Sequence, residues 1–577
     1  MPDVPGAPKG AEIAGAGGLP PAEPAPVPPA GGEAGRRNAA LVGAGILLSR
    51  ISGLLREAAI GAFLGTGFAT DAFRAALRIP NLLQNLLGEG VLSASFIPVY
   101  SRLLAEGRRE DAGRVAGAIA GLVALVAALL VVLGVAFARP LTALLAPGFT
   151  GEKLELTVTL VQILTPGVGF LALSAWCLGV LNSHRRFFLS YAAPVVWNAA
   201  AIAVLIAAAL RGLTGAPLAV ALAAGTLAGG VLQFAIQLPG VLRVAPGLRP
   251  SLRVREPGTK RVLRAFGPVV AGRGVVQLSG YLDLALASLL ATGAVGALGY
   301  AQVIYLLPIS LFGMSVAAAE LPELSSSADA PPALLRTRLE DGLARVTFFV
   351  VPTATIYVLL GNLVIGLLYE RGRFEADDTL QVWAILGAYS LGLLATTSSR
   401  LLQSVYYAVG DPRTPARISA VRVAVSVLLG GVLMLQLDRL ELTAAGLELV
   451  GDLPAFAPVD DTLRGGDGSF YRLGAVGLAL AAGISAWLEY GLLRRGVRRR
   501  AGRVRLGGGR LWPTALAAAI AAAAGLVTQA LLVNVGGLVT AIATLGAAGF
   551  AYAVAARALG LHELRVIIDQ VFRWRRR

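Results

Sequence analysis

Charged and polar side chains interrupt an apolar stretch of the chain between Ser49 and Ser95. A charge at the centre of a bilayer costs roughly 2.5–3.5 kcal/mol on insertion scales, so such residues need a partner or a wet cavity. Arginines in excess over carboxylates bind planar anionic groups such as phosphate in a bidentate manner. The pattern therefore predicts a phosphate-binding membrane cavity, with candidate residues Ser49, Arg50, Arg56, Glu57, Asp71, Arg74, Arg78, Asn81, Gln84 and Glu89.

Helical geometry gathers these side chains into two stripes. At about 100° per residue, Glu57 falls about 20° from Arg50, and Arg78 falls about 20° from Asp71. Polar stripes do not face lipid, so we expect both stripes to face a shared cavity. A second interpretation stays open, in which the arginines only form ion pairs with nearby carboxylates. Pro80 interrupts the second stripe and predicts a kink there.

Composition places the chain among polytopic membrane proteins. It has 577 residues, 56% of them hydrophobic, and a mean hydropathy of +0.71. A single cysteine excludes a disulfide framework, and two histidines argue against a zinc site. Fourteen apolar runs approach or exceed the ~20 residues that a bilayer requires. They are 38–63, 70–103, 113–138, 155–181, 189–211, 216–241, 262–291, 295–320, 340–368, 380–409, 416–437, 472–494, 512–534 and 536–559.

The loops alternate in charge. Connections after even-numbered runs are rich in arginine, whereas those after odd-numbered runs are poor in basic residues or acidic, including 438–470. The positive-inside rule then predicts that both termini are cytoplasmic. The net charge of +16 thus reflects topology and attraction to anionic lipid, and it does not indicate nucleic-acid binding.

Several motifs resemble those of the MurJ (MviN) family of bacterial lipid II flippases, within the multidrug/oligosaccharidyl-lipid/polysaccharide exporter superfamily. The resemblance covers roughly residues 38–560, apart from 438–470. It is carried by SRISGLLRE (49–57), GTGFATDAF (65–73), RIPNLL (78–83), GEGVLSASFIPV (88–99), YERGRF (369–374) and GDPRTPAR (410–417).

The resemblance implies an all-α fold of two pseudo-symmetric six-helix lobes plus two C-terminal helices. It implies a first lobe at 38–241, a basic cytoplasmic linker at 242–261 and a second lobe at 262–494. A basic loop would follow at 495–511, and 512–559 would form a groove for the lipid tail. The remaining segments are a disordered tail at 1–37, predicted from its Pro-, Ala- and Gly-rich composition, and a basic tail at 560–577.

The chain departs from the family pattern at two positions. Gln84 and Val303 stand where the family has arginines, which removes positive charge from the cavity. Arg273 and Asp283 of the seventh run are candidates for a second-lobe cavity or ion site. Some family members use a carboxylate on this helix in a sodium site, but here the eleventh and twelfth runs offer few oxygen ligands beyond Ser426 and Ser485. A coupling Na⁺ or H⁺ stays open, and we expect no other cofactor and no firm metal site.

The resemblance implies a non-enzymatic flippase that moves lipid II across the bacterial inner membrane by alternating access. Alternatives are an exporter of another polyprenyl-diphosphate glycan, a small-molecule antiporter, and a non-transporting scaffold. The paired carboxylates Asp377–Asp378 and Asp460–Asp461 could suggest metal ligands of a glycosyltransferase, but we expect solvated charges. The expected partners are lipid II or a related lipid, membrane lipids and cell-wall synthesis proteins. We expect a monomer.

Overall fold

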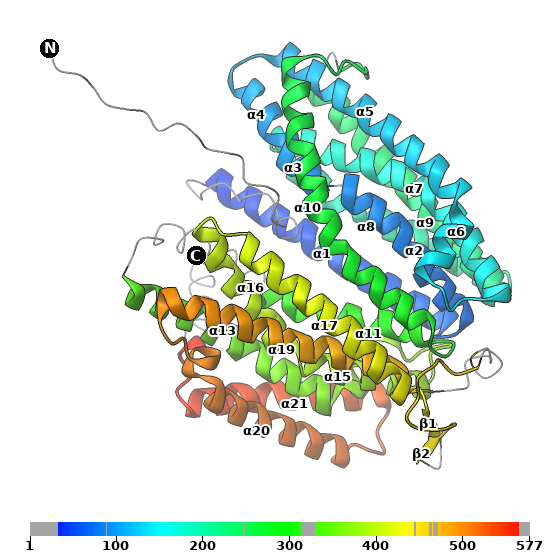
Figure 1. Cartoon of the computed structure of the whole chain (residues 1–577), viewed down its shortest axis with the longest axis vertical. Coiled ribbons are helices and arrows are strands. Elements are labelled where there is room, and N and C mark those ends of the chain that lie inside the picture. Colours follow the sequence, from blue (N-terminus) through cyan, green and yellow to red (C-terminus); the bar gives the residue numbers. More distant parts are fainter. Residues whose placement is uncertain are drawn as a thin grey trace.

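The structure is a computed structural model. It describes residues 33–87, 89–245, 248–313, 316, 331–443, 446–460, 464 and 471–564. These residues are mostly helical. The blue and cyan helices of the first half form one group, the light-green to orange helices form another beside it, and the green helix α10 (Pro257–Ser288) runs along both (Figure 1). The two-lobe arrangement expected from the sequence is therefore present.

The first lobe begins with the helices that carry the polar stripes. Pro80 lies within α2, so the helix continues through the proline that was expected to kink it. The elements of this lobe are α1 (Glu33–Leu64), α2 (Phe68–Leu87), α3 (Glu89–Ser95), α4 (Ile97–Ala105), α5 (Arg109–Ala136), α6 (Ala138–Leu145), α7 (Gly151–Ser183), α8 (Phe187–Leu210) and α9 (Gly215–Val244).

The second lobe follows the linker, and α20 and α21 pack along its far side (Figure 1). Its elements are α10 (Pro257–Ser288), α11 (Ala294–Pro308), the π-helical turn η1 (Ile309–Gly313), α13 (Pro332–Leu359), α14 (Gly361–Tyr369), α15 (Ala376–Ser390), α16 (Leu393–Ala408), α17 (Arg413–Leu437) and α19 (Gly474–Ala501). The short 3₁₀ helix η2 (Leu506–Gly509), α20 (Leu511–Leu531) and α21 (Gly537–Ala558) complete the chain.

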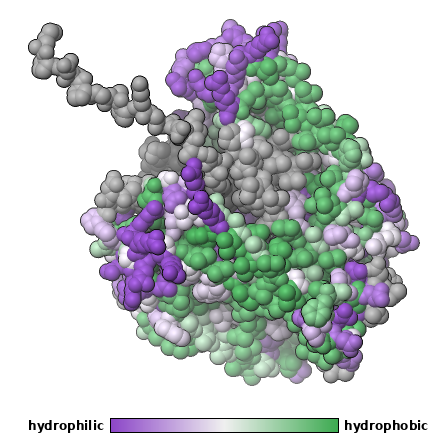
Figure 2. All heavy atoms as spheres, viewed as in Figure 1, coloured by the Kyte–Doolittle hydropathy of each residue, from purple (hydrophilic) through white to green (hydrophobic). Residues whose placement is uncertain are grey.

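The helices are long and apolar enough for a multi-span membrane protein. Within the described residues, ten single helices qualify as membrane spans, and the pair α15–α16, bent by 42°, makes an eleventh. In its described part, each of the fourteen expected runs coincides with a helix or a succession of helices. The three runs outside those eleven correspond to α1, to α2–α4 and to α10. Hydrophobic atoms cover much of the visible surface, and hydrophilic atoms gather toward its ends (Figure 2).

Three expected boundaries are corrected. α1 begins at Glu33, so residues 33–37 are helical, whereas the rest of the predicted tail lies outside the described residues. α10 begins inside the predicted linker because Pro257 occupies its first turn, where a missing N–H costs nothing. α19 continues to Ala501, so the arginines up to Arg500 lie on a helix, and the basic loop is shorter than expected.

The acidic segment 438–470 contains a small antiparallel hairpin. β1 (Leu440–Thr443) pairs with β2 (Gly446–Leu449), and Glu441 forms an isolated bridge with Arg472. Asp438, at the end of α17, is 2% exposed and leads into this hairpin. The segment that the sequence left without an interpretation is thus anchored to the ends of α17 and α19.

Candidate functional site

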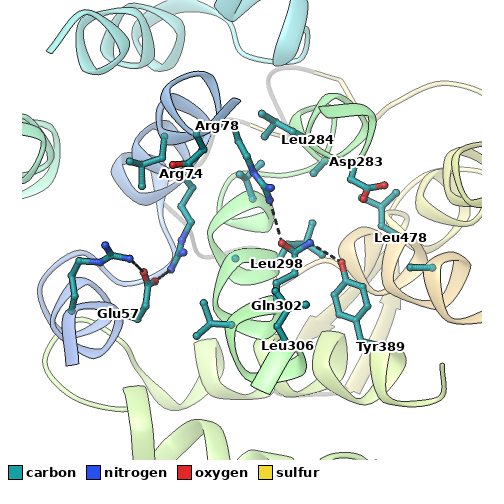
Figure 3. A pocket seen from close by; sticks show the side chains of 18 residues that line it. Glu57, Arg74, Arg78, Asp283, Leu284, Leu298, Gln302, Leu306, Tyr389 and Leu478 are labelled. Atoms are coloured by element: carbon teal, nitrogen blue, oxygen red, sulfur yellow. Dashed lines mark hydrogen bonds and ion pairs between the residues drawn. The ribbon is translucent and has the colours of Figure 1, made fainter. Parts of the chain in front are cut away.

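A cavity of about 220 Å³ lies between the two lobes. Its first-lobe wall comes from α1 and α2, and its second-lobe wall comes from α10, α11, α15 and α19 (Figure 3). Apolar side chains form much of the lining. The polar lining residues are Arg56, Glu57, Arg74, Arg78, Asn81, Asp283, Gln302 and Tyr389.

One buried carboxylate joins two arginines in the first-lobe wall. Arg56 Nη2 donates to Glu57 Oε1 at 2.8 Å, and Arg74 Nη2 donates to Glu57 Oε2 at 2.6 Å. Glu57 is 6% exposed, so both ion pairs lie away from solvent. Charge-assisted hydrogen bonds of this length fix the guanidinium planes. The ion-pair interpretation therefore holds for Glu57, but one carboxylate balances only one of the two cations.

Aromatic rings support both guanidinium groups. Arg56 Cζ lies 4.5 Å from the centre of the Trp197 ring, and Arg74 Cζ lies 4.4 Å from that of Tyr300. Cations over such faces gain electrostatic stabilisation that grows when water is removed. Gly299 makes the second contact possible, because a Cβ there would lie 2.5 Å from Arg74 Cδ. The arginines are thus positioned by neighbours from both lobes.

A hydrogen-bonded chain crosses the cavity from Arg78. Arg78 Nη2 donates to Gln302 Oε1 at 3.2 Å, and Gln302 Nε2 donates to the Tyr389 hydroxyl oxygen at 3.1 Å (Figure 3). The hydroxyl of Tyr281 donates to the carbonyl of Arg78 at 3.2 Å. The hydrogen-bond partners that the second lobe offers this arginine are therefore neutral. Val303 also lines the cavity, so no cation replaces the missing family arginine at that position.

Asp283 is the second-lobe carboxylate of the cavity. The charges of Arg78 and Arg422 act on it. Ser485 donates its hydroxyl to the Ala482 carbonyl within its own helix. Among the described residues no group of three or more His, Cys, Asp and Glu side chains could hold a metal ion. The neighbours that act on Asp283 are therefore cationic, and a coupling Na⁺ or H⁺ stays a prediction from the sequence.

Asp71 is not in the cavity, although it shares a helix face with Arg78. It is fully buried, where it pairs with Lys153 Nζ at 2.5 Å and accepts hydrogen bonds from the backbone N–H groups of Gly293 and Gly296 at 2.8 and 2.7 Å. It therefore caps the N-terminus of α11. Seven residues along a helix amount to about 10 Å, so equal angle does not mean equal depth.

Other predicted site residues also lie outside the lining of the cavity. Arg50 is exposed and donates to Ser310 Oγ at 3.3 Å, and the carbonyl of Ser49 accepts from the Ser52 hydroxyl. Gln84 is half-buried and is not a lining residue. The side chains of Glu89 and Arg273 lie outside the described residues.

The sequence interpretation missed several contributors. No motif singled out Lys153, Trp197 or Tyr389, which come from α7, α8 and α15. Tyr300 and Gln302 had a signal, because they belong to the Y-A-Q-V segment in which Val303 replaces the family arginine. Their contacts depend on the approach of the second lobe, which sequence spacing does not encode.

The lobes are joined at the end of the cavity that the loop charges predict to be outside. Thr66 donates to Asp378, the Tyr300 hydroxyl donates to the Gly65 carbonyl at 3.1 Å, and Arg373 N donates to the Ala62 carbonyl at 2.8 Å. Together with the hydrogen bonds that Asp71 of α2 accepts from the start of α11, these bonds form what we call the interlobe seal. The expectation that Asp377 and Asp378 are both solvated is wrong for Asp378. It is 5% exposed because it completes a capping box with Glu375 and accepts from Thr66 across the lobes.

Comparison with known proteins decides the family. The family model described as "Lipid II flippase MurJ" matches residues 60–448. A lipid II flippase MurJ of Burkholderia cenocepacia is 32% identical over 464 residues, which cover 79% of this chain and 82% of that protein. The chain belongs to the MurJ lipid II flippase family.

Other relatives agree with this assignment. A probable lipid II flippase MurJ of Rhizobium tropici is 35% identical over 67% of this chain and 73% of its own length. A solved structure described as "Lipid II flippase MurJ, inward closed conformation" has a TM-score of 0.70 at 21% identity. The match covers 90% of this chain and 98% of that one. An inward-facing multidrug resistance MATE transporter has a TM-score of 0.60 at 14% identity, covering 79% and 95%.

Membership in the MurJ family confirms the expected family and the all-α membrane fold. The family transports lipid II, and its members are flippases. Within this frame, the cavity carries three arginines against two carboxylates. The excess of positive charge is what an anionic cargo requires, and aromatic rings hold two of the three cations in place.

Proposed function

We propose that this chain moves lipid II from the cytoplasmic to the outer leaflet of a bacterial inner membrane by alternating access. The observation that carries the proposal is the one-sided cavity. Its net positive charge comes from Arg56, Arg74 and Arg78 of the first lobe, at the interface between the two lobes. The diphosphate of the cargo replaces Glu57 as the partner of one guanidinium group, while the polyprenyl tail stays in the bilayer.

The size of the cavity supports a moving interface. Its 220 Å³ lies below the roughly 300–1,000 Å³ of ordinary small-molecule pockets. A diphosphate-linked disaccharide peptide needs far more room than this. The lobes must therefore separate for loading, and the interlobe seal must open for release.

Lipid II transport by purified protein tests the proposal. Proteoliposomes containing fluorescent lipid II should show protein-dependent flipping with the wild-type chain, and Arg56→Ala should abolish it. Arg139→Ala is the matched control, because Arg139 is an exposed arginine paired with Glu155 outside the cavity. Absence of lipid II flipping in wild-type vesicles, with flipping of another polyprenyl-diphosphate glycan, would replace lipid II as the cargo.

The orientation is a separate proposal, in which both termini face the cytoplasm. A cysteine at Phe456, which is 87% exposed beside the hairpin, should react with an impermeant maleimide in intact spheroplasts. A cysteine at exposed Arg499, at the end of α19, should not react until the membrane is opened. Cys177→Ala removes the only native thiol, which is buried. The opposite labelling pattern would reverse the orientation.

A further inference from the structure

A second pocket of about 570 Å³ lies away from the cavity, at the arginine-rich end of the second lobe. Residues from the last turns of α19 form one wall, and the segment that leads into η2 forms the other. Hydrophilic atoms gather near the ends of α13, α16 and α19 in the same view (Figures 1 and 2). The lining residues are Trp487, Tyr490, Gly491, Arg494, Arg495, Arg498, Arg503, Val504 and Leu506.

The walls of this arginine pocket are fixed by hydrogen bonds. Arg494 donates from Nε and Nη2 to the Val504 carbonyl at 2.9 and 2.6 Å, which holds the loop against α19. Arg505 donates its backbone N–H and its guanidinium to Glu340 at 2.8–3.1 Å. The loop is therefore tied on both sides, and the space between it and α19 is a built feature of the fold.

Three exposed arginines of the pocket, Arg495, Arg498 and Arg503, have no carboxylate partner among the described residues. Nearby acids are already engaged, because Glu340 binds Arg505 and Asp411 lies 3.7 Å from Arg500. Like charges gathered without acids repel one another unless an anion joins them. Guanidinium groups favour phosphate, to which they bind in a bidentate manner.

Two aromatic side chains of α19 contribute to the pocket wall. Tyr490 lines the pocket and is 3% exposed, and its buried hydroxyl has no hydrogen-bond partner among the residues that the structure describes. A buried polar group without a partner costs free energy, so such groups are uncommon in folded proteins. Its ring meets Trp487 edge-on at 5.9 Å, so the two aromatic side chains support each other in the pocket wall.

The pocket is polar at one end and apolar at the other. Trp487 is 39% exposed, and it precedes Arg498 by eleven residues, or roughly 16 Å along the helix. Tryptophan favours the interface between headgroups and hydrocarbon, whereas arginine favours the headgroup layer. This order matches a lipid whose phosphate lies among the arginines and whose chains follow α19.

We propose that the arginine pocket binds the phosphodiester headgroup of an anionic phospholipid. Arg498 and Arg503 hold the phosphate, and Trp487 contacts the upper part of an acyl chain. Basic pockets between helices on the cytoplasmic side of membrane proteins bind lipid headgroups in this way. The bound lipid would brace α19 against the loop that leads to α20. This site is separate from the cargo cavity and does not depend on lipid II as cargo.

Lipid titration of the purified, delipidated full-length chain tests the pocket. An Arg74→Ala background removes a cavity arginine, and native mass spectrometry counts bound phosphatidylglycerol and phosphatidylcholine. Phosphatidylglycerol should bind at least tenfold more tightly. Arg498→Gln with Arg503→Gln should lower that affinity about tenfold, as expected for the loss of charged hydrogen bonds.

A matched pair of arginines controls for general surface charge. Arg417→Gln with Arg499→Gln removes two exposed arginines of the same end that do not line the pocket, and it should change the affinity less than twofold. An equal loss in this control would overturn the site in favour of diffuse attraction. Equal binding of the two lipids would also overturn it, and so would displacement of phosphatidylglycerol by equimolar inorganic phosphate.

Discussion

Two buried carboxylates in this molecule have similar neighbours but different roles. Glu57 in the first lobe pairs with Arg56 and Arg74 on the wall of the cavity. Glu489 in the second lobe, 2% exposed, accepts from Gln403 and Ser419 and pairs with Arg422 at 3.2 Å. Only the Glu57 cluster borders the cavity. A charged cluster in a membrane helix is therefore not a cargo site by itself.

The balance of partners explains the difference. Glu57 has two cationic partners, so an incoming anion can take one guanidinium without leaving the carboxylate bare. The Glu489 carboxylate holds one cationic and two neutral donors, which satisfies it without an excess of charge. A buried ion-pair cluster whose charges balance, such as that of Glu489, stabilises the packing of its helices. A buried cluster with an excess of positive charge beside a cavity, such as that of Glu57, is suited to bind an anion.

The largest expected effect separates the arginines of the two clusters. Arg74→Ala should lower lipid II flipping in proteoliposomes roughly 10- to 100-fold, because it removes a charged contact to the diphosphate. Arg422→Ala should leave flipping within about threefold of wild type when equal amounts of folded protein are compared. Arg74→Lys should restore little, since an ammonium group lacks the bidentate fork. If both alanine variants were equally inactive, the two clusters would share one function.

The next effect concerns stability. Glu57→Gln leaves two buried arginines without their carboxylate, so we expect a loss of about 3–5 kcal/mol in unfolding free energy. Glu489→Gln should cost less, about 1–3 kcal/mol. The neutral donors Gln403 and Ser419 can still hydrogen-bond to the new amide oxygen, and the Arg422 side chain is 30% exposed. Thermal unfolding in detergent measures both. A greater loss from Glu489→Gln would contradict the ranking of the clusters.

A smaller effect should follow from moving an arginine without removing it. In Gly299→Ala, the new Cβ would meet Arg74 Cδ at 2.5 Å and push the guanidinium from the Tyr300 ring. We expect a loss of flipping of about tenfold, with normal membrane abundance. Gly431→Ala is the control, because nothing lies within 4 Å of its added Cβ. Wild-type flipping by Gly299→Ala would show that the position of Arg74 is unimportant.

The smallest effect extends the comparison to a carboxylate beyond the end of a span. Burial of Asp438 raises its pKa to about 6, although the charges of Arg472, Arg439 and Arg464 act in the opposite direction. The folded chain therefore binds this proton more tightly than the unfolded chain, and stability falls as pH rises from about 4 to 6. Asp438→Asn should raise the melting temperature at pH 7.5 and change it little at pH 4.5. An equal shift at both pH values would exclude this titration.

Helix faces were predictable because they depend on local periodicity. The sequence placed Arg56, Glu57, Arg74, Arg78 and Asn81 together correctly, since a helix of 3.6 residues per turn fixes their direction. The same arithmetic included Asp71 and Arg50, which lie at other depths along their helices. Depth depends on where the partner lobe packs, and the local pattern contains no information on that.

The sequence by itself determined the class of protein, the fourteen helical runs and the excess of arginine, because hydropathy and charge are properties of single residues. Only the tertiary structure decided that Asp71 caps α11, that Asp378 is buried across the lobe interface and that Gln302 meets Arg78. It also brought the segment before η2 against α19 to form the arginine pocket. These contacts join residues from separate helices, and their partners become defined only when whole helices pack.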